Sequence, residues 1–475
     1  MVTMTEDQWL VRLADAHQKE LPELENLNAH FTGTMPLAYL HPELLRELDG
    51  RLEQVVINWP ELVVDCLDER LDVIGFRVSG QATPDAGLEG IWQYNDLDEW
   101  SQQGQVEALA LKRSFAIVGA NETKDEPARI TIESPLEVHA EHDPRTREVA
   151  AAYKKWSEEL GDGSKVEHAT LYLPDGTTWY VKQKGQWIVD PDHKPDSHKL
   201  GVVPVVPYVN RPRLGIPGGK SELAAIIPVS NAANKIATDM MVSAEFHAMP
   251  RRWAFGFGPE DFQDEHGNKM SLWSKIAGRI WATQKTKNEG AEVGQFPEAN
   301  LENFHKTLNL LAQIVGSLGA LPPQFMGLVN AANPASADAI RSSETRLVKR
   351  AERRQGSFGG SHERTLRIAD RITTGKWRPE LRRLETLWRD ASTPTIAQSA
   401  DAAVKKHQAG ITPLRQTRED LGYTAEQIKL MEGEDAKALE REQTAVFGPR
   451  KDNLTPDVPP VNDPAPEQQP VQPAA

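Results

Sequence analysis

The stretch that decides the fold is GGKSELAAIIPVSNAANKIATDMMVSAEFHAMPRRWAFG, residues 218–256. Apolar residues recur through it at helical spacing and predict a helix from about Ser221 to Phe246. These apolar residues are Leu223, Ile226, Ile227, Ala233, Ile236, Met240, Met241 and Ala244. Pro228 predicts a kink or a restart of that helix, since proline lacks the amide that continues the hydrogen-bond ladder.

A second apolar row follows further along the chain, with spacings that alternate between three and four residues. It consists of Leu301, Phe304, Leu308, Leu311, Val315 and Leu318. This spacing is typical of a helix with a narrow apolar seam. The segment between the two rows, Pro250 to Pro297, is rich in glycine, aromatic residues and turns, and is too short for a core of its own. The sequence therefore predicts two helices that bracket a small insertion.

The residues before this region predict helices first and strands afterwards. Leu40, Leu44, Leu48 and Leu52 recur every fourth residue, and NWPELVVDCLDERLDVIGF (58–76) follows, with Pro60 suited to a first helical turn. Between about 108 and 208 the pattern changes to short β-rich runs, separated by turn residues such as those at 174–176. We therefore expect an α+β fold with an antiparallel sheet.

The residues after the second helix predict a loop and a long polar helix. QFMGLVNAANPAS (324–336) has no clear period, and the helix begins near residue 335. Thirteen basic and five acidic residues between Arg341 and Arg383 leave a local charge of +8. Gly356, Gly359 and Gly360 within it indicate close packing or a kink. Further helices are expected at 396–408 and 424–442, with Thr424 as N-cap, before a disordered proline-rich tail.

Composition limits the kind of protein that this can be. The net charge of −15 argues against tight clamping of nucleic acid, but it suits loose handling of DNA, because each neutralised phosphate would add friction. No apolar run is long enough to span a bilayer, so we expect a soluble intracellular protein without membrane contact. The one cysteine, Cys66, lies among apolar neighbours and is expected to be buried.

No motif in the sequence favours an enzyme. GIPGGKS (215–221) is one residue short of a phosphate loop, and Pro217 removes an amide that such a loop needs. His139 and His142, and the loop with Asp190, Asp192, His193 and His198, match no familiar metal-ligand spacing. We therefore predict no catalytic residue, no metal and no cofactor.

Four segments, taken in order, resemble the portal proteins of SPP1-type siphophages. They are residues 58–76, residues 218–256, NPASADAIRSSETRLVKRAERRQGSFG (333–359) and WRDASTPTIAQSADAAVKKHQAG (388–410). The resemblance covers most of the chain up to about residue 435. It implies a non-enzymatic ring, usually a dodecamer, at a unique capsid vertex. The ring is the channel through which DNA is packaged and ejected.

The resemblance also implies a division of the chain into named regions. The regions are a wing (1–219), stem helix 1 (220–247), an α/β clip (248–299), stem helix 2 (300–320), a tunnel loop (321–336), a long wing helix (337–378), a helical crown (379–442) and a disordered tail (443–475). A helix, a core-poor insertion and a second helix with a narrow seam fit a ring in which neighbouring copies complete the packing.

Residue roles and partners follow from the same resemblance. Residues of the tunnel loop are expected to approach duplex DNA: Gln324, Met326, Leu328, Val329, Asn330 and Asn333. Basic residues of the long helix are expected to meet phosphate or an acidic neighbour, or to be merely solvated: Arg346, Lys349, Arg350, Arg353 and Arg354. Lys285 and Lys287 in the clip are candidates for contact with the terminase large subunit or a head-tail adaptor. Further expected partners are other copies of the chain, the major capsid protein and the scaffolding protein, with assembly in the host cytoplasm.

Two other functions stay open at this point. A minor capsid or head-tail adaptor protein would not need paired helices around an insertion. A nucleotide-binding packaging enzyme would require GIPGGKS to bind phosphate.

Overall fold

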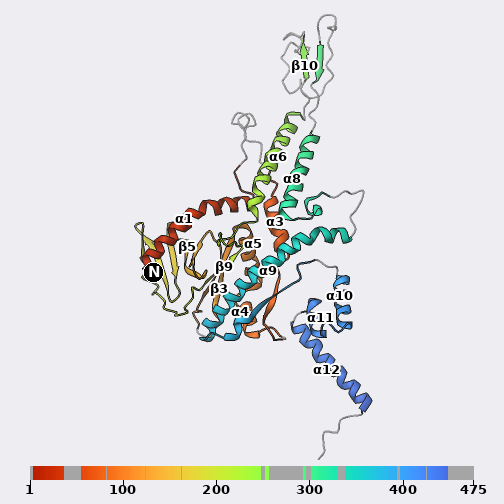
Figure 1. The fold of residues 1–475 in the computed structure, drawn as a ribbon. Coiled ribbons are helices and arrows are strands. Elements are labelled where there is room, and N and C mark those ends of the chain that lie inside the picture. The colour runs from red at the N-terminus through yellow and green to blue at the C-terminus, as the bar shows by residue number, and fades with distance from the viewer. Residues whose placement is uncertain are drawn as a thin grey trace, which may run out of the picture. The chain divides into compact units, whose positions relative to one another are not determined.

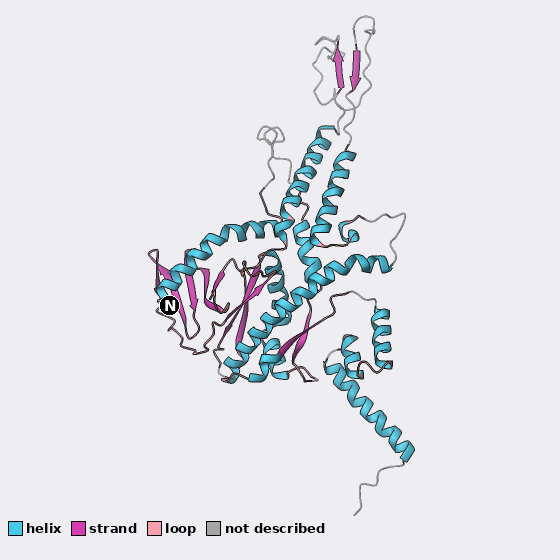
Figure 2. Cartoon of the chain, viewed as in Figure 1, coloured by secondary structure: helices cyan, strands magenta, loops and turns pink. Residues whose placement is uncertain are grey.

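A computed structural model describes most of the chain, in two compact units, Met1–Thr393 and Pro394–Ala475 (Figure 1). The described residues are 4–36, 55–81, 83–123, 125–161, 163–247, 252–255, 292–295, 301–328, 337–392, 396–423 and 425–447. Leu40, Leu44, Leu48 and Leu52 lie outside them, as do Thr424 and the tail beyond residue 447. Helices and antiparallel strands share the first unit, as expected for an α+β fold (Figure 2).

The helices of the first unit agree with the sequence-based expectation in part, and residues 73–78, where helices were expected, form the strand β1. They are α1 (Glu6–Phe31), α3 (Trp59–Asp68), α4 (Ala86–Tyr94), α5 (Leu97–Ala110), η1 (Leu223–Ala225), α6 (Ile227–His247), α8 (Glu302–Gly319), η4 (Pro323–Met326), α9 (Ala337–Thr374) and η5 (Pro379–Arg383). α4 and α5 were not predicted, although Leu88, Ile91 and Trp92 of α4 recur at helical spacing and are buried. Pro60 lies in the first turn of α3, as predicted. Pro228 also lies in a first turn, so α6 restarts there after η1.

The strands form small antiparallel sheets. They are β1 (Val73–Val78), β2 (Arg113–Gly119), β3 (Arg129–Glu133), β4 (Val138–His142), β5 (Val149–Glu159), β6 (Lys165–Tyr172), β7 (Thr177–Gln183), β8 (Gln186–Val189), β9 (Val205–Val209), β10 (Arg252–Phe255), β11 (Glu292–Gln295) and β12 (Leu384–Trp388). β4 to β8 form one meander in chain order, β3-β2-β9 form a second sheet, and β1 pairs with β12. β10 pairs with β11, so the described part of the insertion is a two-stranded ribbon.

The main core lies where α9 crosses the sheet β3-β2-β9 (Figure 1). α9 runs for 38 residues and contacts β2, β9 and β12. The expectation of close packing holds at Gly359, where a Cβ would lie 3.2 Å from the indole nitrogen of Trp388. Gly356 and Gly360 have open space around them. A smaller core between α1 and the five-stranded sheet contains Leu13 and Tyr153.

α6 and α8 pack side by side as an antiparallel pair (Figures 1 and 2). α8 confirms the predicted second helix, and its Gly319 allows close approach to α3, because a Cβ there would lie 3.1 Å from Val63 Cγ2. Cys66 is buried on α3 as predicted, and burial raises the pKa of its thiol to about 11.

The predicted boundary at residue 379 lies too early in the chain. β12 pairs with β1 from Val73↔Trp388 to Val78↔Leu384, so residues 379–392 belong to the first unit. The second unit contains α10 (Ile396–Gln408), as predicted, α11 (Leu414–Asp420), which the sequence analysis missed, and α12 (Ala425–Phe447). α12 continues five residues into the segment expected to be a disordered tail. Arg415 and Arg418 on α11 pair with Glu432 and Asp435 on α12.

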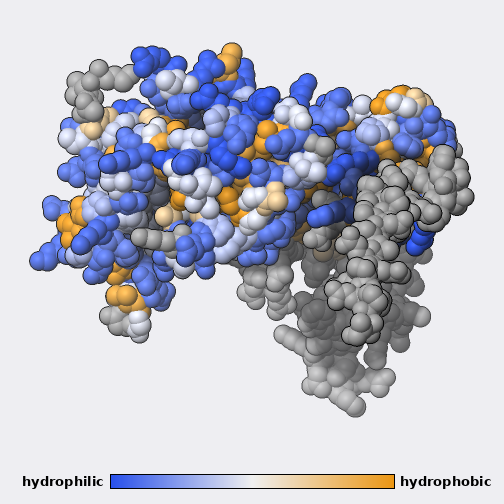
Figure 3. Space-filling view, turned by 90° about the horizontal axis from the view of Figure 1, so that it is seen from below, coloured by the Kyte–Doolittle hydropathy of each residue, from blue (hydrophilic) through white to orange (hydrophobic). Residues whose placement is uncertain are grey.

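The face of the molecule shown in Figure 3 carries mainly hydrophilic side chains, with hydrophobic ones in small groups. Among the described residues, none of the helices is both long enough and apolar enough to span a bilayer.

One titratable side chain lies deep in the main core. His362 on α9 is 1% exposed, and its ring centroid lies 4.8 Å from that of Tyr208 and 5.3 Å from that of Trp92. Its Nδ1 is hydrogen-bonded to the Tyr208 hydroxyl at 3.0 Å. Burial lowers the pKa of His362 to about 3, because desolvation penalises the charged ring.

We expect the free energy of unfolding to fall as pH drops below about 6.5, the ordinary histidine pKa. There the unfolded chain binds a proton at His362, whereas the folded ring stays neutral down to about pH 3, so stability is lost on acidification. In urea unfolding at pH 7 and pH 5, His362→Asn should remove ~2 kcal/mol of this pH dependence. His305→Asn, at an exposed position, is the control and should leave the dependence unchanged. Equal pH dependence in all three proteins would contradict the prediction.

Candidate functional site

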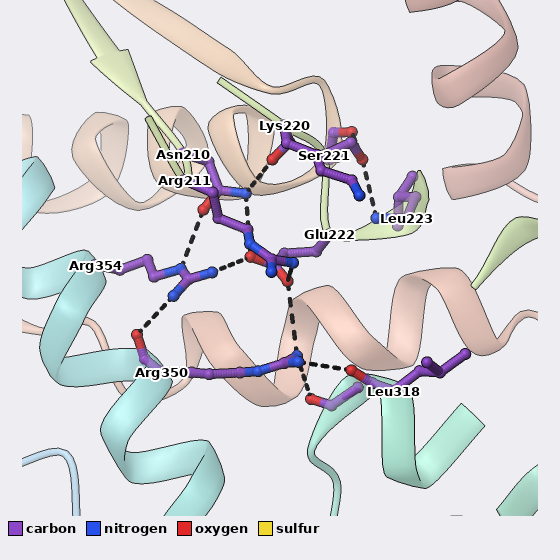
Figure 4. Close-up of polar contacts among 11 residues, drawn as sticks. Asn210, Arg211, Lys220, Ser221, Glu222, Leu223, Leu318, Arg350 and Arg354 are labelled. Atoms are coloured by element: carbon purple, nitrogen blue, oxygen red, sulfur yellow. Dashed lines mark hydrogen bonds and ion pairs between the residues drawn. The ribbon is translucent and has the colours of Figure 1, made fainter. Parts of the chain in front are cut away.

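The segment GIPGGKS joins the end of β9 to the start of η1 and α6 (Figure 4). Three of its amides donate inside the protein: Ile216 N to Arg213 O (2.9 Å), Gly219 N to Ile216 O (3.3 Å) and Lys220 N to Asn210 O (2.9 Å). Just after the segment, Glu222 N donates to Leu109 O (3.0 Å) and Leu223 N to Ser221 Oγ (2.9 Å). A phosphate loop needs such amides to point at its ligand. The segment is therefore built as a connector, and the geometry disfavours nucleotide binding.

Gly219 is required by the backbone. Its φ is +81°, and an added Cβ would lie 2.5 Å from Asn210 O and 2.8 Å from Lys112 O. Ser221 Oγ donates to Ala110 O at 2.6 Å, so the same segment is also held against the end of α5. Of the glycines that suggested a phosphate loop, Gly219 thus serves close backbone packing, whereas a Cβ at Gly215 would meet nothing within 4 Å.

Glu222 follows this connector and is the centre of a buried ionic network (Figure 4). Its side chain is 1% exposed. Oε1 binds Arg354 Nη2 and accepts from Asn210 Nδ2 at 3.2 Å. Oε2 lies 3.6 Å from Arg211 Nη1 and 3.8 Å from Arg350 Nη1. Removing one partner of such a buried pair costs about 3–5 kcal/mol, because the other charge is left uncompensated.

Arg350 extends the network to the end of α8. Nη1 donates to Gly319 O at 2.7 Å and Nη2 donates to Leu318 O at 2.6 Å. These carbonyls belong to the last turn of α8, which lacks intrahelical donors and carries the negative end of the helix dipole. The helix stops at Ala320, which adopts a left-handed conformation with φ +60°. Partial burial lowers the pKa of Arg350.

The basic residues of α9 therefore divide between two faces. Arg350 and Arg354 point inward to Glu222. For these two residues, Glu222 is the acidic neighbour that was one of the alternatives for the basic helix. Arg346, Lys349 and Arg353 are exposed, and Lys349 pairs with Glu352 at 2.5 Å. The sequence analysis missed Glu222 and Asn210; the position of Glu222 directly after GGKS was the available signal.

The described part of the candidate loop is short and packed. Gln324 and Met326 lie in η4, Leu328 follows it, and all three are half-buried. Met326 Cγ would be 3.5 Å from a Cβ at Gly316, so the side chain packs on α8. Met326, Leu328 and Arg346 border a hollow of about 450 Å³ between α8, η4 and α9. Val329, Asn330, Asn333, Lys285 and Lys287 lie outside the described residues.

Three of the four histidines singled out in the sequence have protein partners. His139 Nδ1 lies 3.3 Å from Glu20, His193 Nδ1 lies 2.9 Å from Asp190, and His198 Nδ1 accepts from Leu200 N at 3.3 Å. Within the described ranges, no group of three or more histidine, cysteine or acidic side chains is placed to hold a metal ion.

Comparison with known families identifies the chain. The sequence model of the family described as phage portal protein, SPP1 Gp6-like, matches residues 11–442. The chain belongs to this family. Portal proteins of this family are structural components of the virion, which agrees with the resemblance found in the sequence.

Individual portal proteins are similar over most of their length. The chain is 34% identical over 400 residues to a portal protein of Mycobacterium phage D29, covering 82% of this chain and 80% of the relative. It is 35% identical over 415 residues to a portal protein of Mycobacterium phage L5, covering 84% and 81%.

Two solved structures of gene transfer agent particles are more distant. A chain of the virion of a native particle matches with a TM-score of 0.43 and 12% identity, covering 84% of this chain and 99% of that one. A chain of the neck of such a particle, computed with C12 symmetry, matches with a TM-score of 0.40 and 11% identity, covering 76% and 88%.

Gly219→Ala should destabilise the portal protein by about 2–5 kcal/mol, because it adds left-handed strain and a clash with two carbonyl oxygens. Gly215→Ala in the same connector is the matched control, since a Cβ there meets nothing within 4 Å, and should stay within about 0.5 kcal/mol of the parent. Thermal unfolding of the two variants measures the difference. Equal stability would mean that the connector backbone is not constrained as described.

Proposed function

We propose that the chain forms a closed ring, a dodecamer, at one capsid vertex, and that duplex DNA passes through its channel during packaging and ejection. The protein itself performs no chemistry; a separate terminase drives the DNA. Membership of the portal family supports this role. The acidic net charge of −15 suits passage, because a uniformly basic lining would bind the phosphates and retard them.

The observation that carries the ring is an apolar row on α8 that a single copy leaves in water. Leu310, Ile314 and Leu318 recur at four-residue spacing and are 56%, 39% and 40% exposed. α8 packs on α6 along another side, so this row is available to a neighbour. In a ring the same two surfaces meet at every interface, which would cover the row in each copy.

The regions named from the sequence are part of this proposal. α6 and α8 are the stem, the ribbon β10–β11 belongs to the clip, and α10 to α12 form the crown. Residues 321–336 are the loop that approaches DNA, and Arg346, Lys349 and Arg353 are basic side chains on the helix that follows it. The clip, including Lys285 and Lys287, docks the terminase and later the head-tail adaptor. Capsid and scaffolding proteins surround the ring, which is assembled in the host cytoplasm.

Ile314→Asp should prevent the ring from closing, because a charge would be buried without a partner at each interface. Native mass and negative-stain images of the purified protein measure the subunit number. Asn309→Asp, at an exposed position on the same helix, is the control and should form rings like the parent. A parent protein that stays monomeric at all salt concentrations would refute the ring. Rings formed equally by the Ile314 variant would place the interface elsewhere.

Deleting Gln324–Asn333 should leave ring assembly intact and reduce the packaging or retention of DNA, because the loop and not the stem meets the duplex. Native mass measures ring assembly, and the amount of nuclease-protected DNA per particle measures packaging and retention. Loss of the ring itself would show instead that the segment is structural.

A further inference from the structure

A single nitrogen atom of Arg350 lies between two acceptors that belong to different parts of the protein. Nη1 donates to Gly319 O at 2.7 Å, at the end of α8, and lies 3.8 Å from Glu222 Oε2, at the start of the segment that leads into α6 (Figure 4). The first is a hydrogen bond and the second is too long to be one. A displacement of about 1 Å would exchange them.

Glu222 Oε2 is an acceptor that is not satisfied. It is buried, and it accepts no hydrogen bond from any residue that the structure describes. A buried acceptor without a hydrogen bond is less stable than a paired one, because it has lost its bonds to water without replacement. Its two cationic neighbours are Arg350 and Arg211, the latter 3.6 Å away with a side chain that is 40% exposed. Both are therefore candidates to complete the pairing of Oε2.

Arg350 stabilises the last turn of α8, after which the candidate DNA loop begins. The carbonyls of Leu318 and Gly319 end α8, and Leu321 N donates back to Gly316 O at 2.9 Å. η4 begins two residues later and packs on α8. The direction in which the loop leaves the helix thus depends on this last turn.

We propose that Arg350 is a positioning residue for the loop and that Arg211 decides which acceptor it serves. With Arg211 beside Oε2, Arg350 stays on the α8 carbonyls and the origin of the loop is held. When Arg211 withdraws, Oε2 draws Arg350 away and the last turn of α8 loosens. The exposed segment 211–217 is thereby coupled to the loop through Glu222. The two states differ in whether Arg350 donates to the α8 carbonyls or to Glu222 Oε2. That this coupling acts on DNA rests on the proposed function; the coupling itself does not.

Hydrogen exchange of the purified full-length protein tests the coupling, because it needs neither DNA nor the other phage proteins. In Arg211→Met, the amides of residues 320–328 should exchange about tenfold faster, while those of α1 stay unchanged. Arg213→Met, an exposed arginine two residues away in the same segment, is the control and should match the parent. Within the described ranges, Arg211 makes no hydrogen bond or ion pair with α8 or η4, so a purely local structural role would leave residues 320–328 unaffected. Equal exchange in the two variants would overturn the proposal.

A second pair of variants tests the shared donor itself. Arg350→Met should accelerate exchange in residues 320–328 at least as much as Arg211→Met, and the double variant should exchange no faster than Arg350→Met alone, since the two changes act through one bond. Additive acceleration would overturn the proposal. Arg350→Lys should not restore protection, because one ammonium group cannot reach both carbonyls in the fixed geometry of a guanidinium fork. Ring formation measured on the same samples reports separately on the proposed function.

Discussion

The buried carboxylate of Glu222 constrains most of the first unit. A charge taken out of water must be compensated within the protein, and the compensation here comes from elements far apart in the sequence. Arg354 and Arg350 come from α9, Asn210 from the end of β9, and Arg211 from the segment after it. One side chain therefore fixes where the sheet β3-β2-β9, the start of α6 and the long helix α9 meet.

α9 transmits that constraint through the rest of the unit. One part of the helix carries the arginines of the network, and a later part packs against β9, β2 and β12 in the main core. Gly359 lets the helix approach β12 closely, with Thr386 Oγ1 donating to Gly359 O at 3.1 Å. β12 in turn pairs with β1 near the other end of the chain. The elements that enclose the core are thus held together along the middle of one helix.

The segment GIPGGKS resembles a phosphate loop, but its role in this structural protein is to position Glu222 in the ionic network. Gly219 in GIPGGKS allows close backbone contact, and the amides of Ile216, Gly219 and Lys220 donate to carbonyl oxygens of the protein itself. The connector places Glu222 at the junction of α9 with the end of α8, from which the candidate DNA loop departs. Local basic residues in an otherwise acidic protein then serve two purposes, since one face of α9 binds Glu222 and the other remains exposed.

The sequence by itself determined the features that depend on neighbours along the chain. The apolar rows predicted α6 and α8, Pro228 predicted a kink or a restart of α6, and the turn residues at 174–176 predicted the strands on either side. The order of four segments also indicated the family. Only the tertiary structure decided that Arg350 and Arg354 face inward, that residues 379–392 join the first unit through β1, and that GIPGGKS binds its own backbone. The periodicity of apolar residues indicates the conformation of each segment. The partner of a charged side chain or of a strand edge depends instead on how distant segments pack. Glu222 and Arg354, for example, form an ion pair although they lie 132 residues apart in the sequence.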